Sequence, residues 1–143
     1  MVIKNGKDIF LSVFLAKGCS GQNGAIEQAS VVYEAFSRGF FKSIIIENKK
    51  VYTINERDGE RQEVSLSDKE WNELADAFKE IKLDQMAQMK APTDKRTYDG
   101  AMHANVTIKL KGENYTTPGF DHQFLPKGIE KFINKLVSLT FVE

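Results

Sequence analysis

Two amphipathic helical segments, each preceded by strand-like segments, set the pattern of this sequence. The first helix is predicted to begin at Ser67, because Glu70 completes a capping box in which each side chain binds a free backbone amide. Apolar residues then recur at helical spacing: Trp71, Leu74, Ala75, Phe78 and Ile81. A second such stripe follows Pro126, a residue that suits the first turn of a helix: Ile129, Phe132, Ile133, Leu136 and Val137. The two stripes predict two helices that each bury one face.

The segments before each helix are expected to form β-hairpins. "FFKSIIIEN" (40–48) and "KKVYTINE" (49–56) are rich in β-branched and aromatic residues, and 31–37 adds a further strand. Later, 104–110 alternates between apolar and polar residues, and 115–120 returns beside it.

Pro118 lacks an amide hydrogen, so the returning strand is expected to lie at an edge or to be interrupted. The order strand–strand–helix therefore occurs twice. It predicts an α+β fold, a two-layer sandwich in which both helices pack on one face of an antiparallel sheet.

The first hairpin is apolar on both faces, which is unusual for a sheet with one face in water. Ile44, Ile46 and Val51 fall on one side, and Phe41, Ile45, Tyr52 and Ile54 on the other. We expect the long connection over 82–100, which contains Met86 and Met89, to cover part of the second face. A second copy of the chain or another partner is the alternative cover.

The N-terminal segment has the pattern of an export signal. Two lysines within residues 1–8 precede the apolar run "IFLSVFLA" (9–16), and Gly18 and Cys19 follow shortly after. A charged stretch, a short apolar stretch and a small residue before the cleavage point are typical of secretory signals. The apolar run is too short to span a bilayer, which needs about 20 residues.

Cys19 directly after a small residue resembles the lipobox of bacterial lipoproteins, in which the cysteine is lipidated and becomes the first residue. The sequence thus predicts a signal peptide over 1–18, a flexible tether over 19–30 and a single domain over 31–143. The alternative is that "IFLSVFLA" is a buried strand followed by a structural cysteine.

Composition excludes several classes of function. Twenty basic residues balance twenty acidic ones, whereas nucleic-acid binders usually carry a basic excess, so no nucleic-acid partner is expected. The single cysteine, Cys19, excludes an intramolecular disulfide and a cysteine-rich zinc site. The chain lacks Gly-x-Ser-x-Gly, P-loop and His-Glu-x-x-His motifs. We therefore expect no cofactor, and a binding module rather than an enzyme.

The two histidines of the chain could form a shared site. If the second hairpin turns through Gly112 and Glu113, His103 lies opposite His122 on the face away from Val106. Two histidines with a nearby carboxylate could bind Zn²⁺, although such a site needs three or four ligands and no second motif supplies them. The alternative is a polar strand end, where aspartates cap turns.

Four stretches resemble a group of small lipoproteins of Bacteroidetes-type bacteria that has no assigned activity. They are "VYEAFSRGFF" (32–41), "WNEL" (71–74), "APTDKRTYDGA" (91–101) and "FDHQFLP" (120–126), and they span most of the chain after Cys19. The resemblance implies export, lipidation and this fold, but no activity.

The charged residues that this resemblance singles out are Arg38, Arg96, Asp99, Asp121 and His122. Together with His103 they form the candidate binding surface. The same groups could instead be a structural ion-pair network that pins the long connection to the sheet.

Two functions remain open from the sequence. The first is a lipid-anchored binding or interaction module of the cell envelope, on the periplasmic side, that contacts a protein or an envelope ligand through its sheet. The second is a metal-dependent or acid–base enzyme that uses His103, His122 and a carboxylate. We favour the first, because the sequence lacks catalytic motifs and the first hairpin is apolar on both faces.

Overall fold

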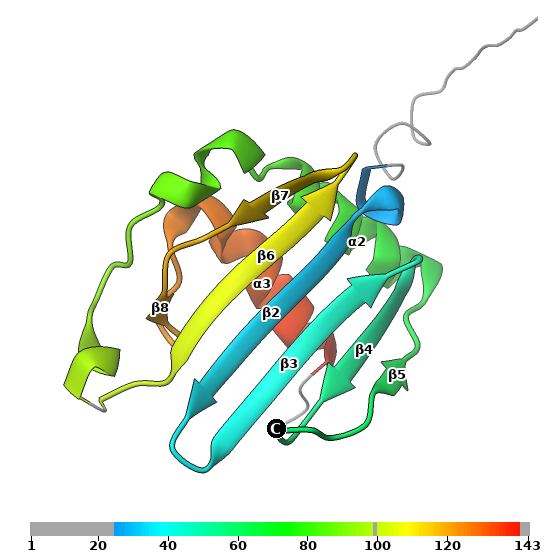
Figure 1. Cartoon of the computed structure of the whole chain (residues 1–143). Helices are drawn as coiled ribbons and strands as arrows, with labels where there is room; N and C mark the ends of the chain where they lie inside the picture. Colours follow the sequence, from blue (N-terminus) through cyan, green and yellow to red (C-terminus); the bar gives the residue numbers. More distant parts are fainter. Residues whose placement is uncertain (1–24, 99, 141–143) are drawn as a thin grey trace, which may run out of the picture.

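The computed structural model describes residues 25–98 and 100–140. It shows an α+β fold in which a seven-stranded antiparallel sheet carries two helices on one face (Figure 1). The strand order is β5 (Gln62–Val64), β4 (Lys50–Ile54), β3 (Phe40–Glu47), β2 (Ser30–Ser37), β6 (His103–Leu110) and β7 (Glu113–Thr116). The short strand β8 (Phe120–Asp121) pairs with β6 on the same edge as β7, past the end of β7. The predicted fold class is confirmed.

The strands of the first half are β2 (Ser30–Ser37), β3 (Phe40–Glu47), β4 (Lys50–Ile54) and β5 (Gln62–Val64). Asn48 and Lys49 join β3 to β4 with φ values of 54° and 63°. A two-residue turn with both residues left-handed matches the twist of the flanking strands, which explains the tight hairpin. The short edge strand β5 was not predicted from the sequence.

The strands of the second half are β6 (His103–Leu110), β7 (Glu113–Thr116) and β8 (Phe120–Asp121). Lys111 and Gly112 form the turn between β6 and β7, with φ values of 52° and 79°. The predicted turn through Gly112 and Glu113 is therefore wrong by one residue, because Glu113 already pairs with Leu110. Residues 117–119 then interrupt the returning strand. Here Thr117 forms two hydrogen bonds with Val106. Its amide donates to the carbonyl oxygen of Val106 at 3.0 Å, and its hydroxyl oxygen accepts from the amide of Val106 at 3.1 Å. The interrupted edge strand predicted from Pro118 is confirmed.

The two helices are α2 (Asp68–Lys79) and α3 (Lys127–Thr140). The predicted capping box is present: the Ser67 hydroxyl accepts from the Glu70 amide at 3.1 Å, and the Glu70 carboxylate accepts from the Ser67 amide at 2.9 Å. The helices contact each other through Phe78 and Phe132, whose ring centroids lie 5.4 Å apart.

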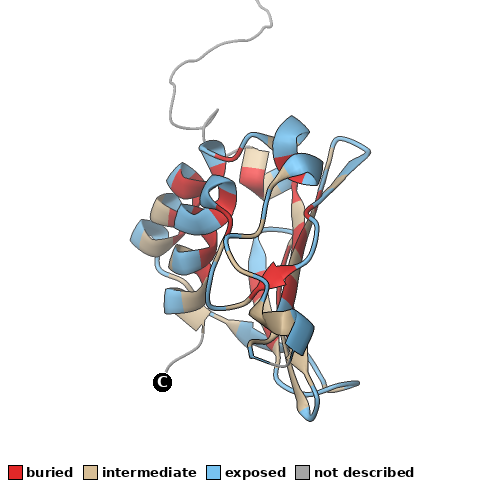
Figure 2. Ribbon diagram, turned by 90° about the vertical axis from the view of Figure 1, so that its left-hand side faces the viewer, coloured by how far each residue is buried: buried red, intermediate tan, exposed pale blue. Residues whose placement is uncertain are grey.

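The core lies between the sheet and the helix layer (Figure 2). Ile26 and Ala29 belong to this core, with exposed fractions of 0% and 3%, and residues 25–28 form a helical turn. The predicted tether over 19–30 is therefore wrong for residues 25–30, which are part of the domain. Residues 1–24, including the predicted signal peptide and Cys19, lie outside the described residues.

The long connection contains two short 3₁₀ helices, η1 (Leu83–Gln88) and η2 (Lys95–Tyr98). Met86 is fully buried in the same core cluster as the two helices, and Met89 lies against Gly128 near the start of α3. The connection thus packs on the helix side of the sheet. The expectation that it covers the second face of the first hairpin is wrong, because its methionines fill the end of the main core instead.

Candidate functional site

His103 and His122 lie on opposite sides of the sheet. His103 is exposed on β6, and its backbone pairs with Asp121 of β8, not with His122. Thr116 of β7 pairs with Thr107, and Phe120 of β8 pairs with Ala104. Between these two pairs the returning strand therefore has one residue more than β6, and it lies within 117–119. The turn at Lys111 and Gly112 shifts the pairing of β7 by two residues from the predicted register, and this extra residue shifts the pairing of β8 back by one. A net shift of one residue reverses the faces of a strand, so the predicted convergence of the two histidines is wrong.

His122 instead contacts the buried side of the sheet. Its Nδ1 lies 2.5 Å from the hydroxyl oxygen of Tyr33, a core residue of β2. Burial lowers the pKa of His122, and the nearby Lys42 lowers it further. Among residues 25–98 and 100–140, no group of three histidine, cysteine or carboxylate side chains could hold a metal ion. The geometry thus gives no support to a site shared by His103 and His122.

Arg96 and Asp121 form a buried ion pair at 3.0 Å. Asp121 is fully buried and also accepts hydrogen bonds from the Thr93 hydroxyl and from the amides of Lys95 and Arg96, at 2.8 and 3.0 Å. Burial by itself would raise the pKa of Asp121, but the bonds from Thr93 and Arg96 hold it well below its usual range. These contacts attach η2 to β8. For Arg96 and Asp121 they are the structural ion-pair network that the sequence offered as the alternative to a binding surface.

Arg38 lies in a different environment, at the exposed turn between β2 and β3. Together with His103 it lines a depression of about 620 Å³ that also includes Phe36, Arg57, Met102 and Gln123. We call this depression the arginine groove. The structure thus divides the predicted surface: Arg38 and His103 line the groove, whereas Arg96, Asp121 and His122 have partners within the fold. Asp99 lies outside the described residues.

The rings of Phe36 and His103 form the floor of the arginine groove, and they belong to a row of rings on the uncovered sheet face, the face away from α2 and α3 (Figure 1). Phe41 of β3 lies opposite Phe36 of β2, and Phe36 lies opposite His103 of β6. The rings of Phe36 and His103 are stacked, with centroids 5.4 Å apart and planes inclined by 10°.

Arg57 reaches over this row from the loop after β4. Its guanidinium carbon lies 6.0 Å from the ring centroid of Phe36 and 5.6 Å from that of Phe41. Its terminal nitrogen also donates to the carbonyl oxygen of Ser37 at 3.2 Å. Stacking on rings fixes the orientation of a guanidinium while leaving most of its donors free for a ligand.

The remainder of the uncovered face is partly apolar. Ile45, four residues along β3 from Phe41, is only 8% exposed and lies between Tyr52 of β4 and Val32 of β2. Arg61 lies over the Tyr52 ring at 5.1 Å and pairs with Glu47 at 2.8 Å. Long side chains thus shield the apolar centre of this face, in place of the predicted connection.

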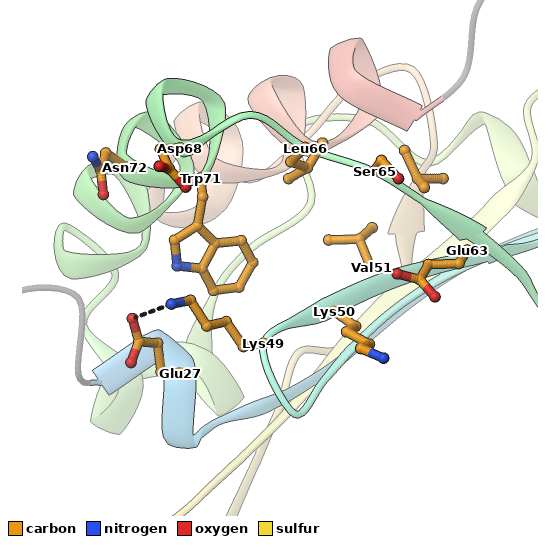
Figure 3. Close-up of a pocket in the computed structure, with 11 residues that line it drawn as sticks. Glu27, Lys49, Lys50, Val51, Glu63, Ser65, Leu66, Asp68, Trp71 and Asn72 are labelled. Carbon is orange, nitrogen blue, oxygen red and sulfur yellow. Dashed lines mark ion pairs between the residues drawn. The ribbon is translucent and has the colours of Figure 1, made fainter.

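A second depression, of about 450 Å³, lies at the other end of β3, between the β3–β4 turn, β5 and the start of α2 (Figure 3). Trp71 of α2 forms one wall and is 7% exposed. We call this depression the tryptophan pocket. Its apolar lining is Val51, Val64 and Leu66, and its rim is charged.

Sequence reasoning missed Arg57 and Trp71 as site residues. Arg57 directly follows the predicted strand over 49–56, and nothing in the neighbouring sequence indicates that its side chain returns over the sheet. Trp71 was assigned to the core stripe of the first helix, which is correct for its ring. Its nitrogen was the available signal, because a buried indole N–H requires a partner.

No helix among the described residues is long and apolar enough to cross a membrane. Comparison of the chain with models of protein families, with curated proteins and with solved structures found no match. The geometry of the arginine groove and of the tryptophan pocket is therefore the basis for proposing a function.

Proposed function

We propose that the chain is a lipid-anchored interaction module of the cell envelope, on the periplasmic side. Its arginine groove would bind an acidic, partly aromatic segment of a protein partner. The observation that carries this proposal is the pair Arg38 and Arg57, which form no ion pair with any residue of 25–98 or 100–140 although they share one depression.

The other arginines show by contrast what a satisfied guanidinium looks like in this fold. Arg96 pairs with Asp121 at 3.0 Å and Arg61 pairs with Glu47 at 2.8 Å. The planar fork of arginine matches a carboxylate through two parallel hydrogen bonds. Two unpaired forks in one groove therefore favour a ligand that carries carboxylates.

The ring row favours a ligand with apolar side chains between its charges. Phe36 and Phe41 are half-buried, and the stacked ring of His103 continues the row across three strands. Aromatic residues and arginine are the residue types that protein interfaces use most above the surface average. An acidic peptide segment with aromatic residues satisfies both the guanidinium groups and the rings.

The proposed lipid anchor is Cys19, and the support for it is the order of the N-terminal segment. A charged stretch, a short apolar run and a small residue precede this cysteine. Anchoring would hold the domain near the membrane and raise the effective concentration of its groove for partners in the same compartment.

The proposal can be tested with a synthetic peptide of alternating glutamate and phenylalanine. We expect amide NMR shifts in residues 36–38, 57 and 102–103, and an affinity that falls as salt is added, because exposed charges are screened. The double variant Arg38→Ser, Arg57→Ser should abolish these shifts. Arg61→Ser is the matched control, since Arg61 lies on the same face outside the groove.

A peptide in which lysine replaces glutamate completes the experiment. Equal binding of the two peptides, or shifts confined to residues outside the groove, would contradict the proposal. Equal loss of binding in Arg61→Ser and in the double variant would also contradict it, because the attraction would then be a property of the whole face.

A further inference from the structure

The tryptophan pocket is separate from the arginine groove. It lies at the opposite end of β3 and on the helix side of the sheet, where Trp71 of α2 faces the β3–β4 turn (Figure 3). We infer that it is a second binding site, for a small uncharged molecule rich in hydroxyl groups, such as a saccharide unit. This inference does not depend on the function proposed for the groove.

The first observation is an unsatisfied donor. Nε1 of Trp71 is buried and has no hydrogen-bond partner within residues 25–98 and 100–140. Buried polar groups are nearly always bonded, so an orphan donor beside a depression indicates that something with an acceptor binds there. In Figure 3 the indole nitrogen lies on the side of Lys49 and Glu27, toward the rim. Because the nitrogen itself is buried, a ligand oxygen would complete the bond once the rim side chains beside it shift.

The second observation is the shape of the lining. The indole ring forms a flat wall, and Val51 and Leu66 supply further apolar surface. A volume of about 450 Å³ falls within the usual range for small-molecule sites. A compact ligand with one apolar face can therefore lie against the ring.

The third observation is the mixed charge of the rim. Two ammonium groups and three carboxylates line it: Lys49, Lys50, Glu27, Glu63 and Asp68. Lys49 and Glu27 already pair with each other at 3.5 Å. A ligand with a single charge would be repelled by part of such a rim. Hydroxyl groups both donate and accept, so an uncharged polyol can bond to the carboxylates, the ammonium groups and the indole N–H together.

The test uses Trp71 itself as the reporter, because it is the only tryptophan in the chain. The full-length protein is titrated with glucose, galactose and N-acetylglucosamine, and separately with leucine and with acetate, while indole emission is recorded. We expect a saturable change in emission with at least one saccharide and none with leucine or acetate. Saturation by leucine or acetate alone would overturn the assignment to an uncharged polyol.

Two variants assign the binding to the pocket. Trp71→Phe keeps an aromatic wall but removes the donor, and calorimetry should show saccharide affinity weakened by about tenfold. Glu63→Gln changes an exposed rim residue and leaves the core intact, so it tests the rim even if Trp71→Phe is poorly folded. Arg57→Ser, in the arginine groove, is the matched control and should bind like the wild type.

Two results would contradict the site. An emission that stays constant with every saccharide at high concentration would mean that water alone satisfies the indole. Saccharide binding that is unchanged in both Trp71→Phe and Glu63→Gln would place the binding elsewhere on the protein.

Discussion

The hydroxyl oxygen of Tyr33 lies 2.5 Å from Nδ1 of His122, on the side of the sheet opposite to His103. This contact separates the two histidines of the chain into different environments. His122 is part of the fold, attached to a core tyrosine, whereas His103 is a stacked ring on the uncovered face. Because His122 is partly buried, we expect it to make the stability of the domain depend on pH.

His122 is expected to lower the stability of the domain in acid. Burial, together with Lys42, holds its pKa below the ordinary value of 6.5. The unfolded chain therefore binds the proton more readily, so the free energy of unfolding falls as pH drops below about 6.5. Urea unfolding between pH 7.5 and about 5 measures this slope.

The matched variants are His122→Asn and His103→Asn. The first should flatten the slope, because it removes the buried titrating group. The second should leave the NMR titration of His122 unchanged, since His103 is on the other face. A titration of His122 that shifts in His103→Asn would mean that the two rings interact after all.

Asp121→Asn should destabilise the domain by about 3–5 kcal/mol, because it leaves the Arg96 guanidinium half-buried without its carboxylate. Denaturant unfolding at neutral pH measures the loss. Glu47→Gln is the control: it breaks the exposed pair with Arg61 and should cost far less than Asp121→Asn. Similar losses for the two variants would show that Asp121 does not anchor the connection.

The same carboxylate predicts part of the acid unfolding. The pKa of Asp121 is depressed in the folded state, so its contribution is complete above the unfolded value near 3.8 and is lost as pH falls below it. The wild type should therefore lose stability between pH 4 and about 2 more steeply than Asp121→Asn. Parallel curves for the two proteins would contradict this assignment.

The domain boundary can be tested by truncation. Ile26 is fully buried and Ala29 nearly so, and both lie before the boundary predicted from the sequence. We expect a chain that begins at residue 25 to unfold cooperatively, and one that begins at residue 31 to be much less stable. Ile26→Ala should by itself cost about 2–5 kcal/mol in urea unfolding. Equal stability of the two truncated chains would show that residues 25–30 are dispensable.

The proposed lipid anchor predicts a change in cell fractionation. Wild-type protein should lack residues 1–18, fractionate with membranes and be released from them only by detergent. The variant Cys19→Ser should remain unlipidated and be recovered without detergent. Mass spectrometry of the purified protein measures the acyl chains and the new N-terminus. Wild-type protein that keeps residues 1–18, or that is as soluble as the variant, would exclude this anchor.

Much of the fold could be predicted because its signals are local. The capping box of Ser67 and Glu70 marks the start of α2, and the apolar stripes mark the buried faces of both helices. The interruption at Pro118 follows from its missing amide hydrogen. The direction of the long connection could not be predicted, because apolar side chains such as Met86 fit either face of a sheet and only the tertiary packing selects one.

The site was less predictable for a related reason. The register of β8 depends on one additional residue in 117–119, and alternation gives no sign of an inserted residue. The predicted turn through Gly112 and Glu113 also lies one position too far along the chain, since the observed turn is Lys111 and Gly112. The two errors together placed His122 opposite His103, where Asp121 lies. Arg57, in the loop after β4, stacks over the rings of Phe36 in β2 and Phe41 in β3. Such a contact between distant segments leaves no local pattern.

The most direct test of the proposed function is a reversal of charge in the arginine groove. In the double variant Arg38→Glu, Arg57→Glu, we predict that the preference changes from the glutamate–phenylalanine peptide to its lysine–phenylalanine counterpart, while Arg61→Glu retains the preference of the wild type. Affinities of both peptides for all three proteins, measured by calorimetry at one ionic strength, decide the matter. If the double variant keeps the wild-type preference, or if Arg61→Glu reverses it equally, the groove is not the site of recognition.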